Sequence, residues 1–171
     1  MEGGCAIKLT WMKQILLLIT YFPLALFAQK RDSVAMPKAN RIIISTNKPA
    51  NENYKLLQTA FVNGGYTIDI KNDDSLLVQT AETRGNSVAI SYHLNGIARE
   101  NEIILYGKYS AGVDASIGGT GTKVFVYDIA NTGKKGTASR STFEAMNDIA
   151  KLFNRKIYYM IIDAKKASIF R

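Results

Sequence analysis

The sequence contains few of the residues from which common active sites are built. Among its 171 residues are one cysteine (Cys5), one histidine (His93), one tryptophan and three prolines. A single cysteine cannot form a disulfide within the chain, and a tetrahedral zinc site draws most of its ligands from Cys and His. These counts exclude a disulfide framework and a Cys/His zinc site, and we expect neither a metal nor another cofactor.

An apolar run near the start of the chain predicts export. Residues 15–28 read ILLLITYFPLALFA, with Lys13 before them and a polar stretch after them. A basic start, a short apolar core and a small last residue are typical of a cleaved signal peptide. We therefore expect a signal peptide over residues 1–28, with Met12 as an alternative start, and a periplasmic or secreted product.

Two other interpretations of this run stay open, a buried apolar helix and an uncleaved anchor. The run is shorter than the roughly 20 residues that span a bilayer and is interrupted by Pro23, which favours cleavage. Leu26 stands where a small residue is preferred, so the cleavage site is less defined than the signal. Cys5 precedes the apolar core, whereas a lipid-anchoring cysteine would follow it, so we expect no lipid anchor and no transmembrane span after cleavage.

The remaining roughly 140 residues suffice for one domain with a hydrophobic core. Residues 29–40 are mixed and polar and predict a flexible lead-in, residues 41–163 predict a single α+β domain, and residues 164–171 form a basic tail.

Apolar periodicity predicts two helices and a mostly antiparallel sheet. Tyr54, Leu57 and Phe61 recur at helical spacing within 51–63, and a second amphipathic helix begins at 139–141 and reaches Phe153. Extended patterns predict strands at 41–46, 66–70, 76–82, 87–94, 102–109 and 123–129. Residues 157–162 fit a final strand or a continued helix, and their β-branched and aromatic content favours the strand. The fold class is α+β, with two layers and both helices on one face of the sheet.

The glycine-rich stretch 110–122 and the single histidine are the strongest candidates for a phosphate-binding site and a catalytic site, respectively. Gly118–Thr122 is followed by a strand, whereas a phosphate-binding loop leads into a helix, so we interpret 110–122 as a mobile loop. His93 shares a strand face with Ser91, and Glu82 or Asp69 could lie nearby, but no nucleophile-elbow sequence accompanies them. We assign no catalytic residue.

Positive charge is concentrated near the C-terminus. From Lys134 onward nine basic residues stand against three acidic ones, which accounts for most of the net charge of +8. Such a region could contact an anionic membrane or cell-wall surface, or it could be an ordinary solvated helix face and tail. The candidate contact residues are Lys134, Lys135, Lys151, Arg155, Lys156, Lys165 and Lys166.

Five segments carry a resemblance to known proteins: RIIIST (41–46), YKLLQTAFVNGGYTI (54–68), NEIILYGKY (101–109), FEAMNDIAKLF (143–153) and IYY (157–159). In these segments the chain resembles a family of small exported proteins of Gram-negative bacteria. The order of its elements also looks like the helix-grip (TBP-like) domains of an outer-membrane assembly lipoprotein. The resemblance implies an envelope location and a packing role for these segments, without catalytic residues.

Together these observations favour a non-enzymatic envelope protein that binds another macromolecule, either an envelope protein or an anionic surface, and not nucleic acid. The first alternative is a binder of a small apolar ligand held between the last helix and the sheet. The second is a hydrolase with a dispersed site, for which His93 is the best candidate residue.

Overall fold

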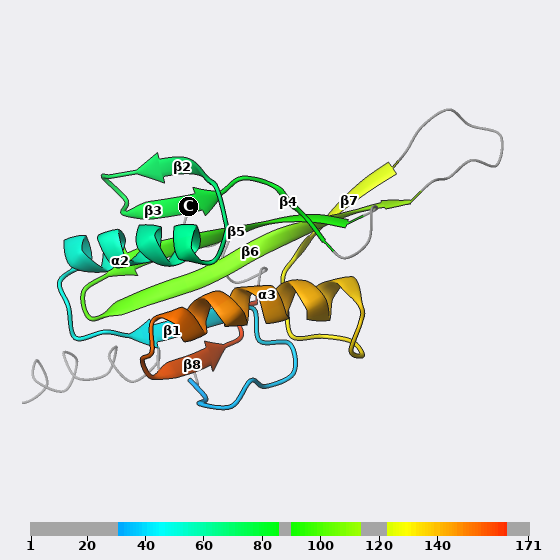
Figure 1. The fold of residues 1–171 in the computed structure, drawn as a ribbon. Helices are drawn as coiled ribbons and strands as arrows, with labels where there is room; N and C mark the ends of the chain where they lie inside the picture. Colours follow the sequence, from blue (N-terminus) through cyan, green and yellow to red (C-terminus); the bar gives the residue numbers. More distant parts are fainter. Residues whose placement is uncertain (1–30, 86–89, 114–122, 164–171) are drawn as a thin grey trace, which may run out of the picture. The chain divides into compact units, whose positions relative to one another are not determined.

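The computed structural model describes residues 31–85, 90–113 and 123–163 (Figure 1). Its elements are β1 (Arg41–Ser45), α2 (Ala50–Asn63), β2 (Ile68–Asn72), β3 (Leu77–Thr80), β4 (Thr83–Arg84), β5 (Ile90–Arg99), β6 (Glu102–Val113), β7 (Lys123–Asp128), α3 (Ala138–Leu152) and β8 (Ile157–Met160). The predicted signal peptide, most of the glycine-rich loop and the basic tail lie outside the described residues.

All strands pair antiparallel, which confirms the predicted α+β class. The main order is β2-β3-β5-β6-β1-β8, with β4 paired to β5 and β7 paired to β6. The segment 157–160 is the strand β8, hydrogen-bonded to β1, and not a continuation of α3. No helix within the described residues is long and apolar enough to cross a membrane.

One edge of the long strand β6 is divided between two partners. Its first residues pair with β1, from Glu102 to Leu105, and its later residues pair with β7, from Lys108 onward. β7, residues 108–113 of β6 and residues 90–93 of β5 form an extension that we call the β7 arm. Figure 1 shows the β7 arm running away from the two helices.

Both helices cover the same face of the sheet and supply the core. α2 buries Tyr54, Leu57 and Phe61, and α3 buries Phe143, Met146 and Ile149. These side chains form one apolar cluster with sheet residues such as Ile42, Ile44, Leu94, Ile103 and Leu105. The helical spacing of the apolar residues thus correctly predicted which face of each helix is buried.

The predicted end of the strand 87–94 was wrong. The strand does not end at Leu94, because β5 continues through Asn95 and Gly96 to Arg99. A Cβ on Gly96 would lie 2.5 Å from Leu57 Cδ1, so the glycine allows α2 to approach the sheet closely. The chain reverses only at Asn101, which has a φ of 62°.

The lead-in is also different from the expectation of flexibility. Ala39 is fully buried, and the amide of Lys38 donates to the Asn131 carbonyl at 2.8 Å. The Asn131 side chain donates to the carbonyls of Ala35 and Met36 at 3.0 and 2.9 Å. Asn131 therefore fixes residues 35–39 to the segment between β7 and α3, through its side chain at Ala35 and Met36 and through its backbone at Lys38 and Ala39.

Candidate functional site

The most unusual surface of the described chain is β7. Four consecutive apolar residues are exposed there: Val124 (62%), Phe125 (45%), Val126 (62%) and Tyr127 (46%). A strand that is apolar on both faces normally lies between two layers, but β7 is covered by neither helix. Contiguous apolar surface of this kind commonly marks an interaction site.

The outer backbone edge of β7 is also free within the described residues, where β7 pairs only with β6. The amide of Ile129 donates to the Gly107 carbonyl at 3.0 Å, so residues 129, 127 and 125 turn their backbone groups toward β6. In an antiparallel ladder the alternate residues face the other way. The N–H and C=O groups of Val124, Val126 and Asp128 therefore point outward.

Two other edges of the sheet are protected in ways that β7 is not. β2 carries Asp69 and Lys71 and has a register shift next to Ile70, and charges and bulges both discourage strand addition. β8 exchanges two backbone hydrogen bonds with Asp32, at 3.1 and 2.7 Å. Between residues 124 and 127, β7 has no charge and no proline.

An aromatic row crosses the β7 arm on the face that also bears the helices. The rings of Tyr109 and Tyr127 stack with centroids 5.3 Å apart, and Phe125 lies 6.4 Å from Tyr127. Val124 and Val126 project from the opposite face because side chains alternate along a strand. β7 thus offers apolar contacts on both faces of the sheet to any strand that pairs with it.

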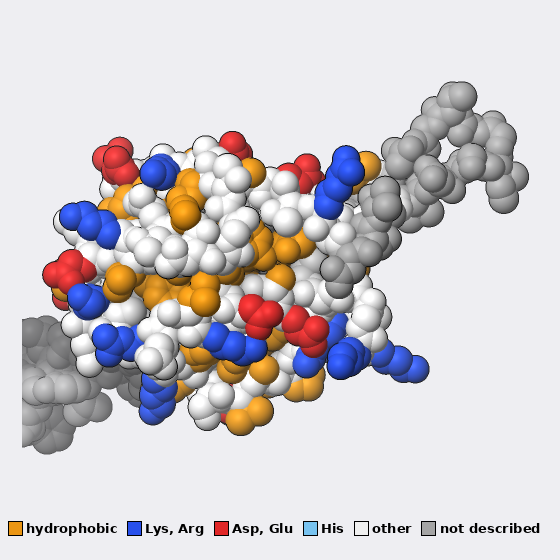
Figure 2. Space-filling view, viewed as in Figure 1, with side chains coloured by type: hydrophobic (Ala, Val, Ile, Leu, Met, Phe, Trp, Pro, Cys, Tyr) orange, Lys and Arg blue, Asp and Glu red, His pale blue; other side chains and the backbone are white. Residues whose placement is uncertain are grey.

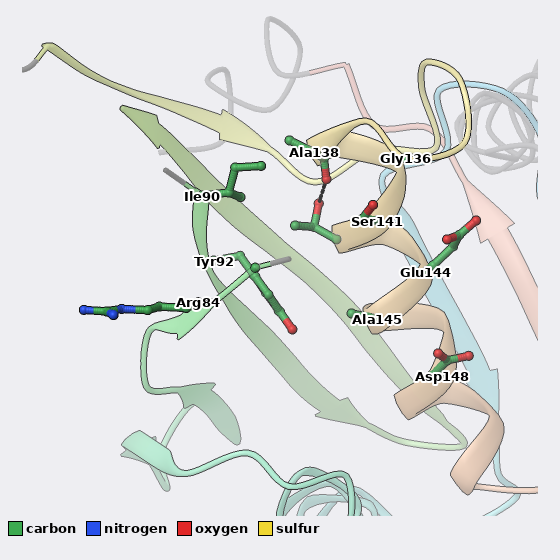
Figure 3. Close-up of a pocket in the computed structure, with 11 residues that line it drawn as sticks. Arg84, Ile90, Tyr92, Gly136, Ala138, Ser141, Glu144, Ala145 and Asp148 are labelled. Carbon is green, nitrogen blue, oxygen red and sulfur yellow. Dashed lines mark hydrogen bonds between the residues drawn. The ribbon is translucent and has the colours of Figure 1, made fainter. Parts of the chain in front are cut away.

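A cavity of about 400 Å³ lies between α3 and the strands β4 and β5 (Figure 3). Ile90 and Tyr92 line its sheet side, while Ser141, Glu144 and Asp148 line its helix side. Figure 3 shows the Arg84 side chain pointing away from the cavity. The walls are therefore apolar on one side and acidic or hydroxylated on the other.

Tyr92 is fixed within this cavity by another tyrosine. Its hydroxyl and that of Tyr66 lie 3.0 Å apart in a hydrogen bond, and the two rings meet edge to face. Burial and this hydrogen bond raise the pKa of Tyr66 well above its usual value. The Tyr66 phenol is accordingly a neutral hydrogen-bonding group and not a nucleophile.

Glu82 and Ser91, two of the residues considered for a hydrolase site, are in contact, but their arrangement does not fit a catalytic triad. The Glu82 carboxylate accepts hydrogen bonds directly from Ser91 and from Ser110, the latter at 3.3 Å. A catalytic triad requires the imidazole between hydroxyl and carboxylate. His93 instead lies opposite Lys108 on β6; burial and the Lys108 charge lower the pKa of His93, and Glu82 opposes them. The adjoining cavity, about 120 Å³, is below the usual size of ligand sites.

The described basic candidates fall into two groups at opposite ends of α3. Lys134 and Lys135 are exposed before the helix, and Lys151, Arg155 and Lys156 are exposed at its end. An α-helix of 15 residues is about 22 Å long. Lys165 and Lys166 lie outside the described residues.

Acidic residues occupy the space between the two basic groups. Glu144 binds Arg140 at 2.9 Å and Asp148 binds Lys151 at 2.7 Å, and Figure 2 shows acidic side chains between basic ones over α3. The hydrogen bond that Lys151 donates to the Asp148 carboxylate raises the pKa of Lys151. Any contact with an anionic surface would involve two separate basic ends of the helix and not one continuous patch.

One feature of the sequence indicates the β7 surface. The residues VFVY in β7 are apolar at every position, whereas a strand on a two-layer sheet normally alternates. That neither helix covers β7 becomes clear only from the structure, in which β7 pairs with residues 108–113 of β6. No protein-family model matches the chain, and no curated protein matches it either.

Proposed function

We propose that this chain is an exported, non-enzymatic protein of the cell envelope that binds a protein partner by strand addition at β7. The observation that carries the proposal is the combination of outward-facing backbone groups at Val124, Val126 and Asp128 with exposed apolar side chains at 124–127. Strand addition uses both, since backbone hydrogen bonds supply affinity and alternate side chains supply specificity. The leader sequence supports the location.

The size of the surface predicts a weak complex. The four exposed side chains present at most roughly 400 Å², which at about 25 cal/mol per Å² corresponds to about 10 kcal/mol. Loss of translational and rotational freedom costs about 4–15 kcal/mol, so little net affinity remains. We therefore expect reversible, concentration-dependent binding.

The proposal is tested by photo-crosslinking in cells with a crosslinkable amino acid at Val126. Val62 provides a matched control, because it is the same residue type, is 60% exposed, and lies on α2 away from β7. We expect a crosslinked species of higher mass from position 126 that is absent from position 62. No adduct above the Val62 background, with either this protein or another, would contradict the proposal.

The cavity beside α3 favours a second candidate function, the binding of a small ligand. Its volume of about 400 Å³ is within the usual range for ligand sites, and it lies between the last helix and the sheet, where a ligand was expected. Its acidic side favours an apolar ligand with a basic or hydroxyl group over a purely apolar one. Chemical shifts of the Ile90 and Ala145 methyl groups test this, and a ligand should no longer bind when Ala145→Phe fills the space.

Binding to anionic surfaces through the basic residues stays a prediction. It is measured by co-sedimentation with vesicles containing anionic lipid at low salt, and binding should fall as salt rises because exposed charges are screened. Salt-independent or absent retention would contradict it.

A further inference from the structure

We infer that the strand added to β7 is β7 of a second copy of this chain, paired antiparallel about a two-fold axis through Val126. This inference rests on the proposed function and names the partner. It follows from the orientation of the backbone groups, from the side chains that such a pairing brings together, and from the position of the only acidic residue on the strand.

The backbone limits the registers in which β7 can pair with itself. Only outward-facing residues can form hydrogen-bonded pairs, and in the described strand these are Val124, Val126 and Asp128. With the axis at Val126, Val126 pairs with itself and Val124 pairs with Asp128 of the other copy. All outward groups are then used, in three pairs with two hydrogen bonds each.

The neighbouring registers use fewer of these groups. An axis at Tyr127 pairs Val124 with residue 130, which lies beyond the strand and after the fully buried Ile129. An axis at Phe125 pairs Asp128 with residue 122, which lies before the strand begins. The register through Val126 is the one that keeps the pairing within Lys123–Asp128.

This register also joins the aromatic rows of the two copies. Phe125 of one copy stands directly opposite Tyr127 of the other, on the face where Tyr127 already stacks on Tyr109. The result is two rows, each running from Tyr109 through Tyr127 to the second copy's Phe125. Cross-strand aromatic pairs are among the more stabilising pairs in antiparallel sheets.

Charge does not oppose the pairing. Asp128 is the only acidic residue of β7, and each Asp128 faces Val124 of the other copy. The two carboxylates are separated by four residues along the strands, which is roughly 13 Å. Like charges are therefore not placed opposite each other.

A two-fold pairing limits the assembly to a dimer. Each copy uses the same edge, so no free β7 edge is left for further copies. The two copies together cover at most roughly 800 Å² of side-chain surface, which is below the typical size of stable interfaces. We therefore expect a dimer that dissociates on dilution.

Single cysteines test the register, in the full chain with Cys5→Ser. Val124 and Val126 are equally exposed, at 62%, and lie on the same face. Hydrogen-bonded pairs have Cα atoms about 5.5 Å apart, within reach of a disulfide. Under oxidation Val126→Cys should form a disulfide-linked dimer at least tenfold faster than Val124→Cys, whose partner is Asp128. Equal rates, or faster linkage of Phe125→Cys than of Val126→Cys, would overturn the register.

Sedimentation of the full chain tests the partner itself. The unmodified chain should show a concentration-dependent dimer, Val126→Lys should be a monomer, and Val62→Lys should behave as the unmodified chain. Thermal unfolding of Val126→Lys with an unchanged midpoint, compared at a concentration at which the unmodified chain is monomeric, shows that the variant folds. If the unmodified chain stays monomeric at several hundred micromolar, the inference that the partner is a second copy of this chain is wrong. The proposed function is contradicted by a different result, the absence of any crosslinked species from position 126 in the photo-crosslinking experiment.

Discussion

Replacing Asn53 tests how the first turn of α2 is held against the sheet. Asn53 is fully buried, and its Nδ2 donates to the carbonyls of Lys48 at 3.0 Å and Arg99 at 2.8 Å. These two carbonyls belong to the segment before α2 and to the end of β5. One side chain therefore connects the first turn of α2 to the segment just before it and to the end of β5, which lies 46 residues further along the chain.

The expected cost follows from the two hydrogen bonds that Asn53→Ala removes; the Lys48 carbonyl keeps the one it accepts from the Asn101 amide at 2.9 Å. A hydrogen bond within a protein contributes about 0.5–1.5 kcal/mol net, so losing both should lower the free energy of unfolding by about 1–3 kcal/mol. That is a large part of the 5–15 kcal/mol typical of a domain. Asn51→Ala is the matched control, because Asn51 is exposed in the same turn and should change stability by less than about 0.5 kcal/mol.

Urea unfolding followed by circular dichroism measures both variants. With a slope of about 1–3 kcal/mol per molar urea, Asn53→Ala should unfold at a midpoint lower by roughly 0.5–1.5 M. A loss equal to that of Asn51→Ala would refute the reasoning, since it would show that water replaces the amide without cost.

Asn53→Asp separates hydrogen bonding from packing, because it keeps the size of the side chain. An ionised carboxylate beside two carbonyls cannot donate, and burial raises its pKa in the folded state. A raised folded-state pKa makes the folded chain bind the proton more tightly than the unfolded chain does. This variant should therefore recover stability as pH falls toward 4, and Asn53→Ala should not.

Other predictions follow from single contacts. Burial and the hydrogen bond to Asp73 raise the pKa of Tyr54 to about 12. Because Tyr54 then loses its proton at lower pH in the unfolded chain than in the folded one, the free energy of unfolding should fall between pH 10 and 12. The fall should be smaller in Tyr54→Phe. Gly107→Ala should lower the thermal midpoint by several degrees, because its Cβ would lie 2.5 Å from the His93 carbonyl oxygen. An NMR titration should place the pKa of His93 below 6.5, and Lys108→Ala should raise it; an unshifted value contradicts this assignment.

The sequence predicted the helices and strands in which apolar residues recur at regular spacing. The alternation in Tyr66–Ile70 and the helical spacing of Phe143, Met146 and Ile149 each placed an element correctly, within two residues at most boundaries. Gly64 and Gly65 directly follow the last residue of α2, and Gly65 has a φ of 83°. Local patterns sufficed here because each element buries one face against the same core.

Features that depend on contacts between distant segments could not be predicted in this way. Gly96 resembles a turn residue by type, and only the approach of Leu57 shows that it belongs in a strand. The lead-in was judged polar, but the buried amide of Asn131 fixes it from almost 100 residues away. The exposed edge of β7 likewise depends on where β6 changes partner.

The division of β6 between two partners also has a consequence for local unfolding. Ile103 and Leu105 lie in the core under both helices, whereas residues 108–113 are held mainly by β5 and β7. The outer half can therefore open while the inner half stays folded. Along this one strand, amide hydrogen exchange should slow progressively from Val113 toward Ile103, so that a single continuous strand would span the range from local opening to global unfolding.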